Sequence, residues 1–230
     1  MKQITTVGIV LNRTEFGEAD RIITMLTPEY GKLRLMARGV RREKSKLAGG
    51  IELFSVSDIT FVKGRGEIYM LISSRLQKHY ASIVQDINRT LLGYELTRTL
   101  HRATEDELEP MYFKLLQDTY EALDNSLVPL QLISTWFSAQ ILQLAGHKPS
   151  LQSDENGDKL QQKRSYDFNF DHMIFINDDD GRFNSNHIKF LRLLFSSTDP
   201  QILARIQDST VWLSDLSPIV QTMLKTQIRI

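Results

Sequence analysis

The side chains best suited to chemistry in this sequence are the lysines and arginines of residues 31–46. Seven of the fifteen residues from Lys32 to Lys46 are lysine or arginine, and only Glu43 opposes them. So many cations cannot all be paired locally. A surface of this kind attracts polyanions, because phosphates that are neutralised release their condensed counterions. A solvated, flexible loop is the alternative interpretation of such a run.

The basic segment continues directly from a predicted strand. Residues 32–38 alternate between apolar and mostly basic side chains, which is the two-residue period of a strand with one buried face. Leu33, Leu35 and Ala37 share the apolar face, and Gly39 ends the strand. A basic face that runs into a basic loop favours nucleic acid as the ligand. We expect phosphate contacts from Arg38, Arg41, Arg42, Lys44 and Lys46, with Lys32, Arg34 and Arg13 as additional contacts.

The sequence carries no set of residues that indicates catalysis or metal binding. It contains no cysteine, which excludes disulfides, thiolate catalysis and any cysteine-based zinc site, and its five histidines are scattered. The acidic run before Gly181 resembles a calcium loop, but loop positions one and twelve would be Ile176 and His187, so two oxygen ligands are missing. Phosphate-binding glycine loops and the Gly-x-Ser-x-Gly motif are also missing. We therefore expect a non-enzymatic protein with no metal and no cofactor.

Composition and charge predict a two-domain protein. The 230 residues are 41% hydrophobic and 24% charged, which is ordinary for a soluble globular chain. We find no apolar run long enough for a bilayer and no signal peptide, and we expect a cytoplasmic protein. Residues 1–80 hold 14 Lys and Arg against 8 Asp and Glu, whereas residues 81–230 hold 14 against 20. A basic amino-terminal segment followed by an acidic carboxyl-terminal segment suggests two domains, 1–80 and 81–230, with different partners.

The first eighty residues predict five strands. Pro28 and Gly31 form a turn between the second and third strands, and Gly64 to Gly66 form a tight hairpin between the fourth and fifth. Five short strands bury little as an open sheet, so a five-stranded OB-fold β-barrel is the natural architecture, and such barrels bind single strands. The strands are expected at about 4–13, 20–27, 32–38, 54–63 and 67–78.

The remaining residues predict a mostly helical domain, so the chain is a multidomain α+β protein. Apolar residues recur at three- and four-residue steps from residue 82 onward. Helices are expected at about 82–101, from 104–107 to 123, and at 128–145, 186–197, from 199 and from 217. Between them, a polar insertion at about 150–180 contains two short predicted strands, at 166–170 and 173–176.

Several sequence blocks resemble the RecO family of bacterial recombination mediators. Phe54 and GRGE at 64–67 fit the same pattern, as does the segment from Trp136 to Pro149, near that family's zinc module. Because this chain has no cysteine, the resemblance implies a variant whose insertion at about 150–180 is a metal-free equivalent of that module. The main blocks are GEADRI at 17–22, LTPEYG at 26–31, ARGVRR at 37–42 and KSKL at 44–47.

The resemblance implies a DNA-binding function in DNA repair and recombination. A RecO-like protein is expected to bind single- and double-stranded DNA, to anneal complementary strands, and with RecR to promote RecA loading on DNA coated with single-strand-binding protein (SSB). It also implies binding to the acidic carboxyl-terminal tail of SSB and a cytoplasmic, nucleoid-associated location. Two other classes stay open: an RNA-binding OB-fold protein, and a non-catalytic interaction scaffold whose basic loop is incidental.

Overall fold

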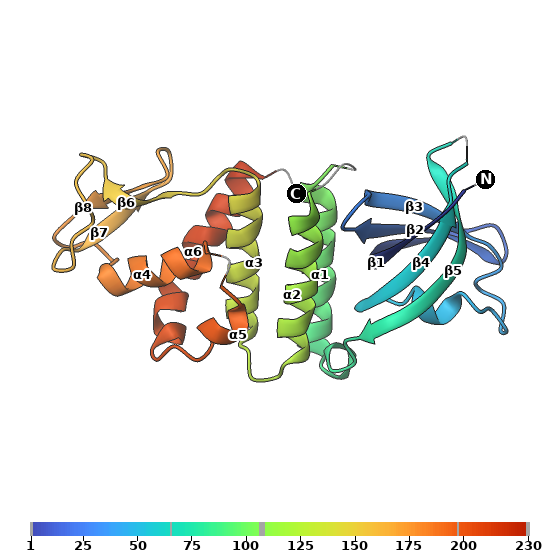
Figure 1. Cartoon of the computed structure of the whole chain (residues 1–230). Coiled ribbons are helices and arrows are strands. Elements are labelled where there is room, and N and C mark those ends of the chain that lie inside the picture. Colours follow the sequence, from blue (N-terminus) through green and yellow to red (C-terminus); the bar gives the residue numbers. More distant parts are fainter. Residues whose placement is uncertain (1, 65, 106–108, 197, 229–230) are drawn as a thin grey trace. The chain divides into compact units, whose positions relative to one another are not determined.

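The computed structural model describes residues 2–64, 66–105, 109–196 and 198–228 (Figure 1). The chain divides into two compact units, Met1–Asn125 and Ser126–Ile230. None of the helices in the described residues is long and apolar enough to cross a membrane.

The first unit contains the five-stranded barrel that the sequence predicts (Figure 1). The strands close in the order β1-β2-β3-β5-β4; every neighbouring pair is antiparallel except β3 and β5, which are parallel. The predicted OB-like architecture is confirmed. Arg65, at the centre of the predicted hairpin, lies outside the described residues. The strands are β1 (Gln3–Phe16), β2 (Asp20–Thr27), β3 (Gly31–Ala37), β4 (Ser55–Val62) and β5 (Ile68–His79).

Apolar side chains at alternate positions along the strands fill the barrel interior. Leu33, Leu35 and Ala37 of β3 all lie in the barrel core, as their spacing predicts. The even-numbered residues of β1 face the barrel interior. Gly8 lies against Met25 and Ile59, and Val10 belongs to the core. The odd-numbered residues of β1, which point the other way, are also buried at the apolar positions Ile9 and Leu11. Both faces of this strand are therefore covered.

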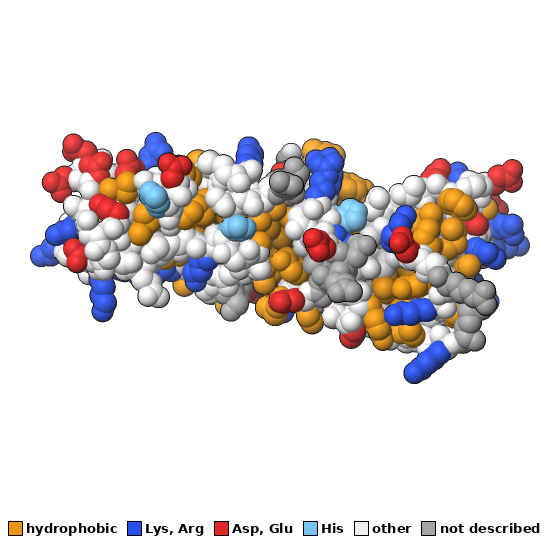
Figure 2. Space-filling view, turned by 90° about the horizontal axis from the view of Figure 1, so that it is seen from above, with side chains coloured by type: hydrophobic (Ala, Val, Ile, Leu, Met, Phe, Trp, Pro, Cys, Tyr) orange, Lys and Arg blue, Asp and Glu red, His pale blue; other side chains and the backbone are white. Residues whose placement is uncertain are grey.

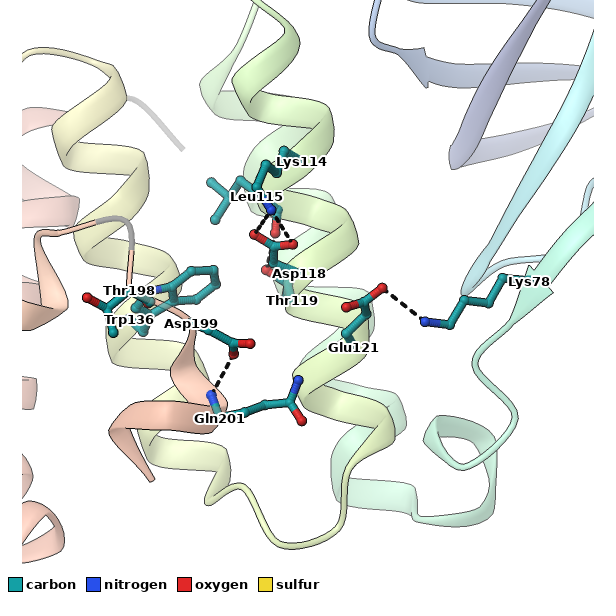
Figure 3. Close-up of polar contacts among 10 residues, drawn as sticks. All are labelled: Lys78, Lys114, Leu115, Asp118, Thr119, Glu121, Trp136, Thr198, Asp199 and Gln201. Atoms are coloured by element: carbon teal, nitrogen blue, oxygen red, sulfur yellow. Dashed lines mark hydrogen bonds and ion pairs between the residues drawn. The ribbon is translucent and has the colours of Figure 1, made fainter. Parts of the chain in front are cut away.

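Two helices of the first unit pack on the barrel: α1 (Ile87–Ala103) and α2 (Pro110–Asp124), after a short 3₁₀ turn η2 (Ile83–Gln85). Phe54, at the entry to β4, makes edge-to-face contacts with Tyr94 of α1 and Tyr120 of α2, with ring centroids 5.1 and 5.4 Å apart. An ion pair from Lys78 of β5 to Glu121 also joins the barrel to α2 (Figure 3). The compact unit thus continues 45 residues past the end of the predicted 1–80 domain.

In its described residues, the second unit combines four helices and a small sheet. The helices are α3 (Leu130–Leu144), α4 (Ser185–Leu194), α5 (Pro200–Leu203) and α6 (Ser209–Gln227). The indole of Trp136 on α3 donates a hydrogen bond to the carbonyl of Thr198, which precedes α5 (Figure 3). The sheet has the order β6-β8-β7, in which β7 (Tyr166–Asn169) and β8 (Ile174–Asn177) match the two predicted strands. The first strand, β6 (Ser150–Asp154), was not predicted.

The predicted start of the last helix is wrong. The sequence places the last helix from residue 217 because proline is tolerated at the first turn, but Pro218 lies inside α6, which begins at Ser209. Packing against α3 explains why the helix continues through the proline: Ser217 bonds to Thr135, and the amide of Gln221 donates to the hydroxyls of Ser134 and Ser138. Tertiary contacts on both sides of the proline outweigh its local cost.

Candidate nucleic-acid interface

The basic loop that follows β3 is anchored at its start to the turn between β1 and β2. The backbone N–H of Gly39 donates to the carboxylate of Asp20 at 2.7 Å, and the N–H of Arg41 donates to the carbonyl of Ala19 at 3.0 Å. Gly39 has a φ of +62°, a conformation that favours glycine. These bonds hold Arg38 and Arg41 on either side of a fixed turn.

The later part of the loop is anchored to the barrel itself. Val40 and Ile51 belong to the barrel core. The hydroxyl of Ser74 on β5 donates to the carbonyl of Leu47 at 2.8 Å, and a Cβ built on Gly50 would lie 2.6 Å from the Ser74 Cβ. Backbone and apolar side chains of the loop are therefore packed, and the basic side chains project from a defined support.

The cations of the loop are exposed. At the right-hand end of Figure 2, lysine and arginine side chains lie among acidic and exposed apolar side chains. Within the described part of the chain, four of the loop cations have no carboxylate partner within 4.0 Å. They are Arg38, Arg42, Lys44 and Lys46.

Three further predicted residues are paired with glutamates at the surface. Arg41 lies 3.3 Å from Glu15, Arg34 lies 3.8 Å from Glu67, and Arg13 lies 2.9 Å from Glu52. Exposed ion pairs of this kind contribute roughly 0–1 kcal/mol, so a phosphate can compete for these guanidinium groups.

Lys32 has a different environment from the other predicted contacts. It is 8% exposed, and its ammonium donates to the carbonyls of His101 and Thr104 at 2.8 and 2.5 Å. These carbonyls lie at the end of α1, where a cation also complements the helix dipole. We therefore leave Lys32 out of the proposed interface and assign it the attachment of α1 to β3.

A half-buried apolar strip crosses the outer face of the barrel, and sequence reasoning missed it. Ile22, Met36 and Met70 are neighbours across β2, β3 and β5 in the strand register, and Arg34 lies two residues from Met36 on the same face of β3. The β2–β3 face is the one that OB folds use for oligonucleotides. Only the parallel pairing of β3 with β5 brings Met70 beside Met36, and no local pattern predicts it.

The donor set of the chain does not resemble a metal centre. Over the residues that are described, no three His, Asp or Glu side chains lie close enough together to hold a metal ion. We predict no stoichiometric zinc, because thiolate ligands are missing and the histidines are scattered. Elemental analysis of the purified protein would check this, and one zinc per chain would contradict it.

The comparisons with known proteins concern the first unit above all. Residues 1–80 match the family model described as "Recombination protein O N terminal". The chain is 32% identical over 152 residues to a DNA repair protein RecO from Dehalococcoides mccartyi, covering 66% of this chain and 59% of that protein. A DNA repair protein RecO from Desulfatibacillum aliphaticivorans is 32% identical over 154 residues, covering 66% and 60%.

A third relative gives the same result over a similar span. A DNA repair protein RecO from Streptomyces griseus is 36% identical over 153 residues, covering 63% of this chain and 62% of that protein. The matches span about three fifths of the length of these curated relatives. The resemblance to the RecO family that the sequence blocks indicate is confirmed.

Proposed function

We propose that this chain, a relative of the RecO DNA repair proteins, is a non-enzymatic recombination mediator that binds single- and double-stranded DNA. The observation that carries the proposal is the anchored basic loop at one end of an OB-like barrel. Four exposed loop cations without carboxylate partners among the described residues provide sites for phosphates, and the packed backbone keeps them together. Such a surface binds through the phosphate backbone and carries little sequence preference.

Strand annealing follows from the same surface. Two complementary strands repel each other through their phosphates, and a cationic surface that contacts both lowers this repulsion. We propose that the chain anneals strands in this way, and that with RecR it promotes RecA loading on SSB-coated DNA. These partners come from the family resemblance, and we propose a location at the nucleoid, in the cytoplasm, for the same reason.

A groove in the first unit supports the SSB tail as a partner. A cavity of about 850 Å³ lies between β1 and α1, with Leu11, Leu91 and Tyr94 among its apolar lining. Arg13 of β1 and Arg98 and Arg102 of α1 add three positive charges to the same cavity, against one carboxylate from Glu95. An acidic tail that ends in hydrophobic residues matches this mixture of apolar and cationic groups.

The proposal is tested by annealing complementary oligonucleotides that are coated with the cognate SSB. We expect the protein to accelerate annealing, and replacement of Arg38, Arg42, Lys44 and Lys46 by alanine to remove most of that effect. Lys163 and Arg164 are adjacent exposed cations of the second unit, and their double alanine variant controls for the loss of positive charge outside the loop. Annealing that is unaffected by removal of the four loop cations would contradict the proposed interface.

Two other functions are separated by simple measurements. An RNA-binding protein would prefer an RNA strand over DNA of the same sequence, because only RNA offers the 2′-hydroxyl. A scaffold whose basic loop is incidental would bind neither strand at low salt.

A further inference from the structure

A second group, of two aromatic side chains and one lysine, lies at the other end of the strands that carry the basic loop; Tyr30 and Lys63 are exposed, and Tyr69 is half-buried. Tyr30 occupies the turn between β2 and β3, Tyr69 lies near the start of β5, and Lys63 directly follows β4. The ammonium of Lys63 lies 5.5 Å from the ring centroid of each tyrosine. This Tyr30–Lys63–Tyr69 cluster combines two aromatic rings with a single cation.

The cluster is held in place by the barrel. Tyr69 stacks on the core residue Phe61 with centroids 5.8 Å apart, and Tyr30 meets the same ring edge-to-face at 5.9 Å. The hydroxyl of Thr27 accepts the Tyr30 N–H and donates to the Gly31 carbonyl, which fixes the turn. Tyr30 nevertheless remains 39% exposed, so an aromatic ring is presented to solvent on a rigid support.

The chemistry of this cluster differs from that of the basic loop. Glu29 beside Tyr30 is bonded to the hydroxyl of Thr6, so a carboxylate lies next to the exposed ring. One lysine beside a glutamate is a poor site for a run of phosphates. The exposed ring of Tyr30, on a fixed support, is instead suited to stacking on an unstacked nucleobase, with a lysine available for one phosphate.

The position of the cluster fits one continuous strand. β2 begins at Asp20, which holds the basic loop, and ends at Thr27, beside the Tyr30 turn. Seven steps of an antiparallel strand span roughly 24 Å. OB folds bind about 4–16 nucleotides of single strand, which is enough to cover this distance. Between the two ends lies the outer face that carries Arg34 and Met36.

We propose that the Tyr30–Lys63–Tyr69 cluster is a base-stacking site for single-stranded nucleic acid, at the end of the barrel opposite the basic loop. The inference rests on the proposed function, since it assumes that the barrel binds a single strand. In this arrangement the loop supplies phosphate contacts and the cluster supplies base contacts. It requires unpaired bases, because bases within a duplex are already stacked.

The test compares two probes of equal length and charge, a single-stranded oligonucleotide and the same backbone without bases. With the whole 230-residue chain, Tyr30→Ala should weaken binding of the oligonucleotide by roughly 5- to 150-fold for each base that no longer stacks. It should leave binding of the abasic probe and of duplex DNA unchanged. The slope of log K against log[salt] should also stay the same, because every phosphate contact is kept.

Matched variants separate stacking from folding. Tyr30→Phe keeps the ring and should bind like the unaltered protein, while Tyr30→Leu keeps apolar contact with Phe61 without a π face and should bind like Tyr30→Ala. If Tyr30→Ala does not fold, the affinities of Tyr30→Leu for the two probes test the stacking site instead. Phe170 of the second unit is also 39% exposed, and Phe170→Ala is the control for removal of an exposed ring. Equal losses of affinity on both probes, or none, would overturn the stacking site, whereas failure of the unaltered protein to bind either nucleic acid would overturn the proposed function as well.

Discussion

At the scale of single residues, the central question is which loop cations touch phosphate. Arg41 and Arg42 are adjacent in the loop, and within the described residues the carboxylate that pairs with Arg41 is that of a surface glutamate, Glu15. We expect Arg41→Ala/Arg42→Ala to weaken DNA binding for all sequences alike. The slope of log K against log[salt] should fall by about one unit for each phosphate that is no longer bound.

The double variant should fold normally, because neither side chain is buried and an ion pair of this kind contributes little. Thermal unfolding checks this, and Lys163→Ala/Arg164→Ala controls for the removal of two positive charges elsewhere. A salt slope equal to that of the unaltered protein would show that these two arginines do not bind phosphate.

Two buried tyrosines that contact each other give a second residue-scale prediction. Tyr80 and Tyr120 are both fully buried, but the Tyr120 hydroxyl bonds to Thr97 at 2.7 Å, whereas the Tyr80 hydroxyl has no hydrogen-bond partner in the described part of the chain. We therefore expect Tyr80→Phe to be neutral or stabilising at neutral pH. Tyr120→Phe should lower the free energy of unfolding by about 1 kcal/mol, because it leaves Thr97 without that partner. Urea unfolding of the two variants measures the difference.

The same tyrosines predict that stability falls in alkali. Burial, and then the negative charges of Glu121 and Asp124, raise the pKa of Tyr80 well above its usual value, and burial also raises the pKa of Tyr120. A raised pKa in the folded state means that stability is fully present below the unfolded-state pKa of about 10 and is lost as pH rises above it. Tyr80→Phe should make this decline less steep, and an unchanged slope would show that Tyr80 is not responsible.

At the scale of secondary-structure elements, Gly93 explains how α1 approaches the barrel. A Cβ at this position would lie 2.7 Å from the Phe54 ring, which is already held between Tyr94 and Tyr120. Alanine would favour the helix by roughly 1 kcal/mol, but overpacking typically costs about 1–3 kcal/mol. Because the ring cannot move easily, we expect a net destabilisation by Gly93→Ala in the upper part of the resulting range, up to about 2 kcal/mol.

A second glycine and a second substitution control that prediction. Nothing lies within 4 Å of a Cβ at Gly49, so Gly49→Ala should change the free energy of unfolding by less than about 0.5 kcal/mol. Phe54→Leu should relieve the clash, so the double variant with Gly93→Ala should be less destabilised than the sum of the two single variants. Strict additivity would contradict direct contact between these two positions.

Elements governed by local sequence were predictable, and those governed by distant contacts were not. Alternation at Leu33, Leu35 and Ala37, and the turn before Gly31, are local signals, and β2 and β3 were found within one residue of their observed bounds. Pro218 is also a local signal, and it was misleading because α3 packs along α6 on both sides of it. The burial of Lys32 depends on carbonyls that lie about 70 residues later in the sequence, and no local sequence pattern predicts such a contact.

At the scale of the whole molecule, the two compact units hardly differ in net charge. The 1–80 segment has a net charge of +6, but the first unit as a whole holds 18 Lys and Arg against 17 Asp and Glu, and the second holds 10 against 11. Two nearly neutral units cannot be distinguished by net charge. The proposed DNA binding therefore depends on the basic loop, where the cations of the first unit are concentrated, and on the exposure of those cations.

This arrangement decides which fragments are informative. A fragment of residues 1–80 would keep the five strands without the packing of Phe54 and Tyr80 on Tyr120 and without the bonds of Lys32 to the end of α1. Its large buried aromatic side chains would then be exposed to water. A fragment of residues 1–125 keeps all of these interactions.

We therefore expect the 1–125 fragment to bind single-stranded DNA with the salt slope of the full chain, although its net charge is only +1. The 126–230 fragment should bind little DNA, and the 1–80 fragment should unfold at a lower temperature than 1–125. Titration of each fragment with the same oligonucleotide at several salt concentrations, after circular dichroism has shown which fragments are folded, measures all three expectations. If a folded 126–230 fragment carried the salt-dependent binding and a folded 1–125 fragment did not, the basic loop would not be the DNA-binding centre of this protein.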